Sequence, residues 1–497
     1  MRAFRLWVCV MTWASVACLG CGDDQAARGP TGPEAPDAPD APSNVRASPG
    51  VQRTTVSWDA VPGASSYNVY WSTSSGVTPT SGTKVEGIGG SPFTHGSLAA
   101  GTYHYVVTAV GDGGESAEST EVSAGVNRVA FVSSATGQGD LGAWPQADGK
   151  TGTAAGDAIC QALASAAGLQ GSFRAYLSDG SDDAYCRVQG LTGKKAANCG
   201  QATPPAGAGP WIRTDGAGWA GTFDSITSID GIEDVRVPLV CDESGAVVQT
   251  TEYIGTGTYI DGTEAGMNEH CQGWTSSSNA ESIAMGRAFA VGASWGSSSG
   301  SSCSATIRLG CLESGTGPVL PPVTPIAGAK TAFLTSSTGT GALGSWPEAG
   351  GKTGVAAGDA VCQARAAAAG LAGAPSFKAW LGVTSTGAKP IDRITSNGPW
   401  VRVDGIQLAR DRADLGGGSI LAGLNIDESG SYVSMWDGAG YVWAWTGARA
   451  NTTCQDWTSV LAGARGETGG YPFTNRSWSE WAALGCDRPQ HLYCFED

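Results

Sequence analysis

The chain repeats a long segment of itself, and this repeat limits the possible folds more than any other feature. Similar stretches recur in the same order, which defines unit one as residues 128–314 and unit two as residues 329–497. The Pro-rich stretch 315–328 joins the two units. The matching pairs are AAGDAICQALASAAGL (154–169) with AAGDAVCQARAAAAGL (356–371), SFRAYL (172–177) with SFKAWL (376–381), GPWIRTDG (209–216) with GPWVRVDG (398–405), DESG (242–245) with DESG (427–430), and CQGWTS (271–276) with CQDWTS (454–459).

Four cysteines have the same spacing in both units. The second and third are 32 positions apart in each unit, and the third and fourth are 8 apart. Four cysteines allow three pairings. We predict the nested one, since an exported chain keeps its disulfides and equal spacing in diverged sequence indicates fixed covalent geometry. The predicted disulfides are Cys160–Cys311, Cys271–Cys303, Cys362–Cys494 and Cys454–Cys486.

Unit one carries three further cysteines. Cys186 and Cys199 flank residues that unit two lacks, so we expect them to close this inserted loop. Cys241 stands where unit two has Ile426, and we expect a buried free thiol there. Pairing of Cys241 with Cys186 or Cys199 is the alternative.

The N-terminus is typical of an export signal. Residues 1–20 combine an early positive charge with an apolar run that is too short to span a bilayer, and no later run is long enough to span one. CLGC then resembles a bacterial lipoprotein signal, which implies a lipid on Cys21; Cys18 and simple secretion are alternatives. Residues 21–43 are rich in Pro, Asp and Ala and predict an extended tether. No Asp follows Cys21, which favours the outer membrane by analogy with lipoprotein sorting.

Residues 44–126 alternate apolar and polar positions between turn signals, which predicts an all-β sandwich. Trp58, Leu98, the Tyr105-x-Val-x-Ala run and a following Gly-x-Ser turn resemble a fibronectin type III domain. We expect this domain to act as a passive spacer.

Each unit is predicted to be an α+β domain with short strands and long Gly/Ser loops. Residues 131–134 and 333–336 predict strands, and Thr153–Ala167 predicts a helix that ends at Gly168. The side chains expected to face inward are Ile159, Leu163 and Ala167 of the helix and Phe173, Ala175 and Leu177 of the next strand.

Three features together resemble a known family: AAGDAICQALASAAGLQGSFRAYLSD, the C-x-x-W of CQDW, and the C-x7-C ending with CFE. They are similar to the endostatin-like domain, and most of all to the endostatin-like outer-membrane lipoproteins of spirochaetes, which have a C-type-lectin-like fold. The resemblance implies a surface-displayed binding domain with nested disulfides. In the pathogen members it also implies adhesion to extracellular-matrix and serum proteins. The basic cluster with which endostatin binds heparin is reduced to Arg174, or Lys378 in unit two, and its zinc-binding histidines have no counterpart.

The stretch TGQGDLGAWPQADGKTG (136–152), which returns at 338–354, imitates a nucleotide-binding loop. A Walker A motif requires Gly where Trp144 and Trp346 stand. We therefore interpret the stretch as a strand-to-helix loop in which glycines supply positive φ and the tryptophan is a packing anchor.

No cofactor, metal or catalytic residue is predicted. GASWG (292–296) lacks a strand–turn–helix context, and His95, His104, His270 and His491 are scattered. Calcium remains the one ion considered, although the E-P-N, Q-P-D and W-N-D motifs of C-type lectins do not occur and DESG is typical of a turn with a solvated acidic face. The carboxylates considered for calcium are Asp242, Glu243, Asp427, Glu428 and Asp437.

Tryptophan is abundant, with 18 residues, several of them late in unit two, such as Trp436. We expect most of them in the core. Trp478 and Trp481, in NRSWSEWAALG, are expected in a surface loop and are the candidate ligand-binding residues.

The formal net charge of −16 argues against nucleic acid or anionic lipid as a partner, since no basic run exceeds Lys194-Lys195. We predict a multidomain, non-enzymatic, adhesin-like lipoprotein of the cell surface that presents two endostatin-like domains to an extracellular protein or glycan. One alternative is a secreted enzyme acting on polysaccharide with an accessory fibronectin domain. Another is a structural envelope lipoprotein without a specific ligand.

Overall fold

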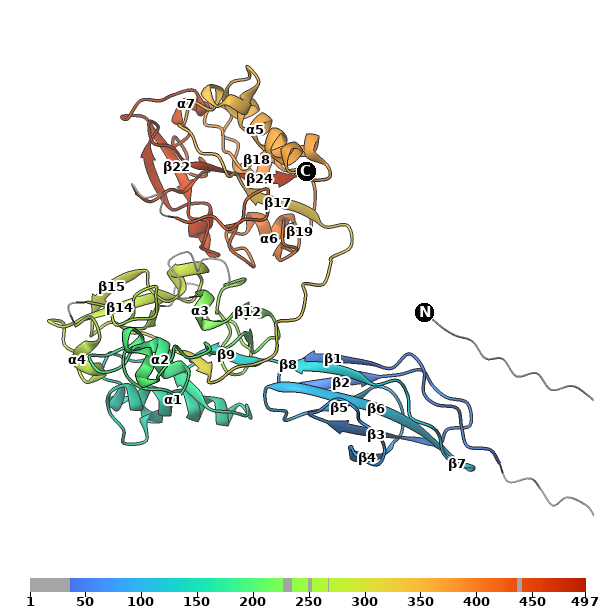
Figure 1. Cartoon of the computed structure of the whole chain (residues 1–497). Coiled ribbons are helices and arrows are strands. Elements are labelled where there is room, and N and C mark those ends of the chain that lie inside the picture. Colours follow the sequence, from blue (N-terminus) through green and yellow to red (C-terminus); the bar gives the residue numbers. More distant parts are fainter. Residues whose placement is uncertain (1–35, 227–234, 249–252, 267, 436–439) are drawn as a thin grey trace, which may run out of the picture.

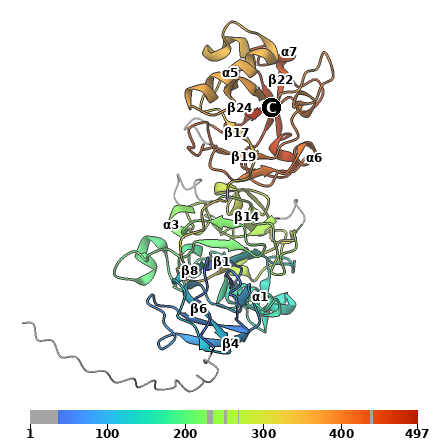
Figure 2. The ribbon, with the colours of Figure 1, turned by 90° about the vertical axis from the view of Figure 1, so that its right-hand side faces the viewer.

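The computed structural model describes residues 36–226, 235–248, 253–266, 268–435 and 440–497. Figure 1 shows a β-sandwich followed by the two units, and unit one lies between the sandwich and unit two. In Figure 2, after a quarter turn, the sandwich lies in front of unit one, and unit two again lies above unit one. The predicted export signal with Cys18 and Cys21, the first part of the tether, Trp436 and Asp437 lie outside the described residues.

The sandwich has two sheets, as its alternating sequence predicted. One has the strand order β1-β2-β5, and the other has the order β4-β3-β6-β7, with β8 also paired to β6. Val56, Trp58, Val69 and Tyr105 are buried between them. The strands are β1 (Arg46–Gly50), β2 (Arg53–Ser57), β3 (Ser66–Ser72), β4 (Thr83–Ile88), β5 (Phe93–His95), β6 (Gly101–Gly111), β7 (Gly114–Glu115) and β8 (Val122–Val126).

Unit one is an α+β domain with a sheet of order β10-β16-β9-β11-β12 and a second sheet of order β13-β14-β15. Its strands are β9 (Arg128–Val132), β10 (Phe173–Ala175), β11 (Trp211–Arg213), β12 (Gly218–Ala220), β13 (Tyr253–Gly255), β14 (Ser282–Arg287), β15 (Ser299–Ser302) and β16 (Gly310–Glu313). Its α-helices are α1 (Gly152–Ala166), α2 (Ala184–Val188), α3 (Phe223–Ile226) and α4 (Cys271–Trp274). Short 3-10 helices are η1 (Leu141–Ala143), η2 (Pro145–Ala147), η3 (Lys195–Gly200) and η5 (Gly292–Trp295).

Unit two repeats this plan, with the strands joined in one sheet of order β20-β19-β17-β24-β21-β22-β23 and with β18 paired to β24. Its strands are β17 (Lys330–Leu334), β18 (Phe377–Ala379), β19 (Trp400–Arg402), β20 (Gln407–Ala409), β21 (Ala444–Trp445), β22 (Arg465–Gly469), β23 (Ala482–Gly485) and β24 (His491–Glu496). Its helices are α5 (Gly354–Ala368), α6 (Arg412–Gly416), α7 (Cys454–Trp457), η6 (Leu343–Ser345), η7 (Pro347–Ala349), η8 (Ala374–Ser376), η9 (Pro390–Arg393) and η10 (Arg476–Trp478).

The predicted helix 153–167 forms one residue earlier, as α1, with Thr151 as its N-cap residue. Ile159 and Leu163 are buried as expected, whereas Ala167 is exposed. Gly168 ends the helix with a φ of 76°, a left-handed conformation that favours glycine. The apolar face is therefore shorter than the pattern predicted, because the chain turns away from the core at Gly168.

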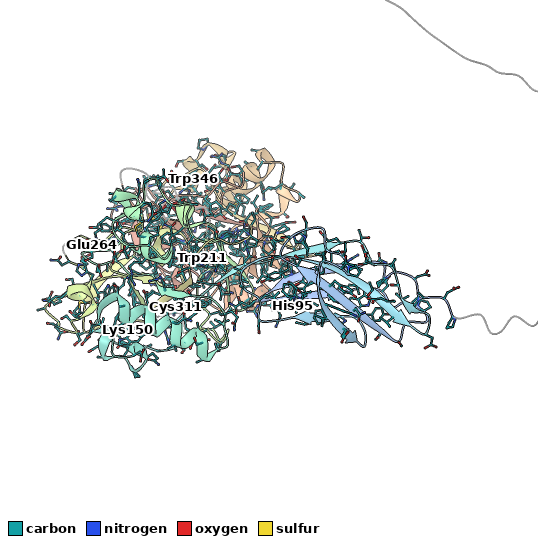
Figure 3. The ribbon with its side chains drawn as sticks, turned by 60° about the horizontal axis from the view of Figure 1, so that its bottom comes forward. His95, Lys150, Trp211, Glu264, Cys311 and Trp346 are labelled. Carbon is teal, nitrogen blue, oxygen red and sulfur yellow. A yellow bond between two sulfur atoms is a disulfide. The ribbon has the colours of Figure 1, made fainter. Side chains whose placement is uncertain are left out.

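Each unit is closed by pairing of its first strand with its last. β9 runs antiparallel to β16, and β17 runs antiparallel to β24. Cys311 and Cys494 lie in these last strands, and each bonds to a cysteine of the long helix. Figure 3 shows Cys311 beside α1 among the side chains that fill unit one. One disulfide thus joins the long helix to the last strand, and backbone pairing joins the last strand to the first.

Five disulfides form, and they join the cysteines that the spacing and the inserted loop paired. Cys241 is a free thiol that is fully buried. Burial raises the pKa of Cys241 to about 11, so the neutral thiol is favoured at physiological pH.

The glycines of these loops have two roles, of which the sequence predicted one. Gly149 and Gly152 have positive φ, as expected, and so does Asp148, but Gly137 and Gly139 do not. A Cβ on Gly137 would overlap the indole of Trp144, and a Cβ on Gly139 would overlap the sulfur of Cys271. The early glycines therefore provide room for a tryptophan and a disulfide rather than backbone freedom.

Unit two has the same arrangement. A Cβ on Gly339 would overlap the indole of Trp346, and one on Gly341 would overlap the sulfur of Cys454. Trp144 and Trp346 are each about 95% buried, and each donates its indole N–H to a carbonyl of its own loop at 3.0 Å. The tryptophan is the packing anchor that the sequence predicted.

We predict that Gly137→Ala lowers the stability of unit one by about 1–3 kcal/mol, because the added methyl group overpacks the Trp144 site. Thermal unfolding of the oxidised chain measures the change. Gly180→Ala is the matched control, since no atom lies within 4 Å of its Cβ position. Equal melting temperatures for the two variants would contradict the packing role.

We also predict that removing Cys160–Cys311 by a double Ala substitution costs roughly 5 kcal/mol, against about 3 kcal/mol for Cys186–Cys199. The reason is loop length, since the two bonds span 151 and 13 positions. Denaturant unfolding of both double variants checks the order, and an equal loss would show that loop closure does not control stability.

Candidate binding site between the two units

The two units meet along a short pair of extended segments. Thr474 donates its backbone N–H and its hydroxyl to the carbonyl of Phe289, at 2.9 and 2.8 Å. Val291 donates its N–H to the carbonyl of Pro472 at 2.8 Å, and Ala290 pairs with Phe473 in an antiparallel bridge. These hydrogen bonds set which residues of unit one lie opposite which residues of unit two.

A cation–aromatic cluster covers this bridge. The guanidinium carbon of Arg287 lies 5.2 Å from the ring centre of Phe473 and 5.3 Å from that of Trp481, both in unit two. It also lies 5.7 Å from Phe289 and 5.4 Å from Tyr253 of unit one. Burial lowers the pKa of Arg287 from its usual value, but an arginine stays charged. Such contacts are worth about 0.5–2 kcal/mol each when partly desolvated.

The structure places the two candidate tryptophans away from an open surface. Trp478 is only 1% exposed and packs on Trp380, with ring centres 4.9 Å apart. Trp481 is half-buried in the contact between the units. The expected surface-loop position of Trp478 is therefore wrong, because η10 turns its ring inward onto β24.

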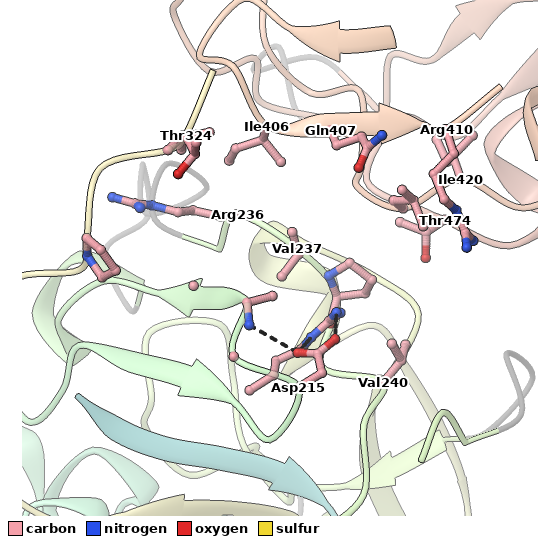
Figure 4. A pocket seen from close by; sticks show the side chains of 18 of the residues that line it. Asp215, Arg236, Val237, Val240, Thr324, Ile406, Gln407, Arg410, Ile420 and Thr474 are labelled. Carbon is pink, nitrogen blue, oxygen red and sulfur yellow. Dashed lines mark hydrogen bonds and ion pairs between the residues drawn. The ribbon is translucent and has the colours of Figure 1, made fainter. Parts of the chain in front are cut away.

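A groove of about 980 Å³ opens beside the contact, between unit one, unit two and the linker. Figure 4 shows Val237 and Val240 on the unit-one side and Ile406, Gln407 and Ile420 on the unit-two side. Pro321, Pro322 and Val323 of the linker and Ser48 and Pro49 of the sandwich also line it. The size and the mainly apolar lining are those of ligand sites in proteins.

One arginine of the groove is held by the unit itself. Arg213 forms a two-pronged ion pair with Asp215 and donates to the carbonyl of Pro238 at 2.7 Å. Burial raises the pKa of Asp215, but Arg213 outweighs burial and the net shift is downward. This pair rigidifies the β11–β12 turn and leaves little free charge at the groove.

Unit two uses the corresponding pair to hold the units together. Arg402, fully buried, forms a two-pronged ion pair with Asp404. It also donates to the carbonyl of Arg236 in unit one at 3.4 Å. A buried arginine needs partners for its N–H groups, and the carbonyl of Arg236 is one of them. This bond holds the backbone at Arg236 against unit two.

The side chain of Arg236 is different. It lies at the groove (Figure 4), and within the described ranges its guanidinium has no hydrogen bond or ion pair. Arg410, on the opposite wall, pairs with Asp414 at 2.8 Å and is 65% exposed. Arg236 is thus available to a carboxylate or phosphate of a ligand.

The DESG turns are internally satisfied. Asp242 accepts hydrogen bonds from its own turn, and Glu243 accepts from Ser134. Asp427 and Glu428 do the same in unit two and are only 7% and 6% exposed, so the expectation of a solvated acidic face is wrong there. The reason is that each glutamate ties its turn to the first strand of the unit.

The histidines are likewise used locally. His270 accepts from the N–H of Gly273 at 2.8 Å and contacts Glu264 at 3.1 Å, and His491 contacts the carbonyl of Thr335 at 2.6 Å. Among the described residues, no three His, Cys, Asp or Glu side chains gather as a metal site would require. The helices of the same ranges are too short or too polar to span a bilayer.

Sequence reasoning did not find the groove, because its walls come from segments about 170 residues apart whose apolar residues look like ordinary core. A weak signal existed in the repeated W-[IV]-R-[TV]-D-G motif, which supplies Arg213 and Arg402 at the edge of each sheet. Nothing in the motif says that the two edges face each other.

Comparisons with known proteins concern a small part of the chain. A fibronectin-III-like protein from Clostridium thermocellum is 35% identical, with 18% of this chain and 92% of that chain covered and a TM-score of 0.15. The structure FN3tt is 16% identical, covering 18% and 94%, with a TM-score of 0.16. The chicken CNTN1 FN1–FN3 domains are 19% identical, covering 18% and 33%, also with a TM-score of 0.16. No family model and no curated protein matches the chain.

We predict that Trp481→Ala loosens the contact between the units, since it removes one ring from the Arg287 cluster. Limited proteolysis should then cut the linker 315–328 faster, while thermal unfolding changes little. Val460→Ala, at a half-exposed position of unit two, is the control. An unchanged cutting rate for Trp481→Ala would show that the cluster does not hold the units together.

Proposed function

We propose that this chain, which contains a fibronectin type III-like domain over about 18% of its length, is a lipid-anchored, non-enzymatic binding protein of the cell surface. In this proposal Cys21 carries the lipid, residues 21–43 form the tether, and the two units are endostatin-like domains of the C-type-lectin-like fold. Five disulfides support export, because such bonds persist in oxidising compartments.

The observation that carries the proposal is the groove between the units with its unpaired Arg236. Arg213, Arg236 and Arg410 line it against a single carboxylate, Asp215, in a chain whose net charge is −16. An acidic ligand is repelled by most of the surface and attracted at this place, which favours a defined docking position. The apolar walls suit hydrophobic side chains beside the acidic group.

The chemistry that fits is an extended segment of an extracellular protein with apolar residues on both sides of an Asp or Glu. Its carboxylate would pair with Arg236, and its apolar side chains would contact the valine and isoleucine walls. A charge-assisted hydrogen bond of this kind contributes about 1.5–3 kcal/mol.

The sandwich supports such a role as a spacer that is firmly joined to unit one. Gln52 and Gln170 exchange hydrogen bonds of 2.6 and 2.7 Å, and Asn127 donates to the carbonyl of Pro318 at 2.5 Å. Only Asn127 separates β8 from β9. In this proposal, a spacer joined in this way holds the two units at a fixed distance from the end of the tether.

The test is a binding array with the exported chain under oxidising conditions, probed with matrix proteins, serum proteins and glycans, with calcium and with chelator. We expect saturable binding to a protein, weakened about tenfold or more by Arg236→Met. Arg465→Met, the same change at an exposed position of β22, is the matched control and should bind normally.

Other outcomes are equally informative. Normal binding by Arg236→Met would show that the ligand does not bind in the groove. Binding to glycans alone would show that the ligand is not a protein. No binding by a folded chain favours the structural envelope alternative, and polysaccharide turnover favours the enzyme.

A further inference from the structure

Unit two contains a second cavity that is separate from the groove. One lobe of about 510 Å³ and a smaller lobe of about 140 Å³ adjoin each other. The two lobes share Lys389, Ala448, Arg449 and Ala450, so two cationic side chains stand where the lobes meet. The larger lobe is within the range of small-ligand sites.

The larger lobe is apolar on one side. Trp380, Trp478, Pro390, Ile391 and Leu415 line it. The indole N–H of Trp380 donates to the hydroxyl of Ser479 at 2.8 Å, but the indole N–H of Trp478 has no partner although the side chain is almost fully buried. A buried donor without a partner costs about 1–3 kcal/mol. Because the nitrogen itself is fully buried, Trp478 offers its ring to the lobe and not its N–H.

The cations of this cavity are incompletely neutralised. Arg449 is half-exposed and lies 3.6 Å from Glu467 and 3.6 Å from Glu480, which is beyond hydrogen-bond distance. Arg476 is already engaged by Glu480 at 2.8 Å. No ion-pair partner for Lys389 occurs within the described ranges. Three cations therefore face two carboxylates.

One of these carboxylates is unusual. Glu467 is completely buried, and neither of its oxygens accepts a hydrogen bond. Burial raises the pKa of Glu467 above its usual value, with Arg449 opposing the shift and Glu480 adding to it. A carboxyl group with a raised pKa and a 3.6 Å separation neutralises Arg449 less completely than a close, solvated ion pair would.

Unit one does not carry these groups at the matching positions. Ala284 accepts the same two backbone hydrogen bonds as Glu467, from Thr256 and Gly257 instead of Thr446 and Gly447, so the two positions correspond. Tyr259 stands where unit two has Arg449, two residues after the matching glycine. In unit one Phe223 packs on Tyr176, the counterpart of Trp380, with ring centres 5.6 Å apart. The charged cavity is thus a property of unit two and not of the shared fold.

We propose that this cavity binds an apolar carboxylate: a carboxylate group joined to an aromatic or branched aliphatic group. The carboxylate lies between Lys389 and Arg449, and the apolar group enters the lobe formed by Trp380, Trp478 and Leu415. This chemistry has two sources, a free small acid or the C-terminus of a peptide that ends in an apolar residue.

The test is calorimetric titration of the disulfide-intact chain with 3-phenylpropionate and with its neutral amide. A short peptide with C-terminal Phe is titrated both as free acid and as C-terminal amide. We expect each acid to bind at least about tenfold more tightly than its amide. Tighter binding of the peptide acid than of the free acid identifies a C-terminus as the source, and the reverse order identifies a small acid.

Two substitutions locate the site. Lys389→Met and Arg449→Met should each weaken binding of 3-phenylpropionate about tenfold or more. The controls are Lys352→Met and Arg465→Met, which are exposed and outside both lobes. Lys389 is exposed, so its variant should keep the wild-type melting temperature.

Three results would overturn the proposal. They are equal affinity for acid and amide, wild-type affinity in both Lys389→Met and Arg449→Met, and no binding heat from either acid up to about 10 mM.

Discussion

Pairing of the first strand with the last, fixed by a disulfide to the long helix, is the constraint on which each unit depends. β9 meets β16 and β17 meets β24, so residues about 160 or more positions apart are neighbours in the sheet. Such long-range pairing costs conformational entropy, which the covalent link reduces by restricting the unfolded chain. Because the paired strands and the disulfide hold the two ends of a unit together, the unit stays folded despite its long Gly/Ser loops and, in unit one, an inserted segment. The same closure places the entry and exit of unit one close together, where Asn127 bonds to Pro318.

The groove exists only because closed units dock on each other. Backbone hydrogen bonds from Thr474 to Phe289 and from Val291 to Pro472 join the two units. Arg287 also lies among four aromatic rings, two from each unit. Arg402 adds a buried contact to the carbonyl of Arg236. These contacts use up their own polar groups and leave the guanidinium of Arg236 at the edge. The proposed binding groove thus owes its free charge to the interface between the units.

Comparison of the units shows how one scaffold supports different cavities. Both units have a tryptophan that packs against a glycine, and both have an Arg–Asp ion pair in the β11–β12 or β19–β20 turn. In both, the glutamate of DESG also accepts a hydrogen bond from the residues that follow the first strand. These residues make contacts that hold the fold together, so they are the same in the two units. Unit one fills the space next to Tyr176 with Phe223, whereas unit two leaves a cavity with Arg449 and Glu467 beside it. Divergence is concentrated where packing does not require a particular residue.

The sequence by itself determined the sandwich, the repeat, the long helices and the pairing of the cysteines, because these follow from alternation, self-similarity and spacing along the chain. It identified the Trp144 and Trp346 anchors and the positive φ of the later glycines, but it missed the packing role of the early ones, since a close approach of a side chain is not visible in a glycine pattern. Only the tertiary structure decided that Trp478 is buried, that Trp481 joins the units, and that the guanidinium of Arg236 has no hydrogen bond or ion pair to the residues that the structure describes. The physical reason is that burial and charge neutralisation depend on which segments meet in space, and the segments that build both cavities are far apart in the chain.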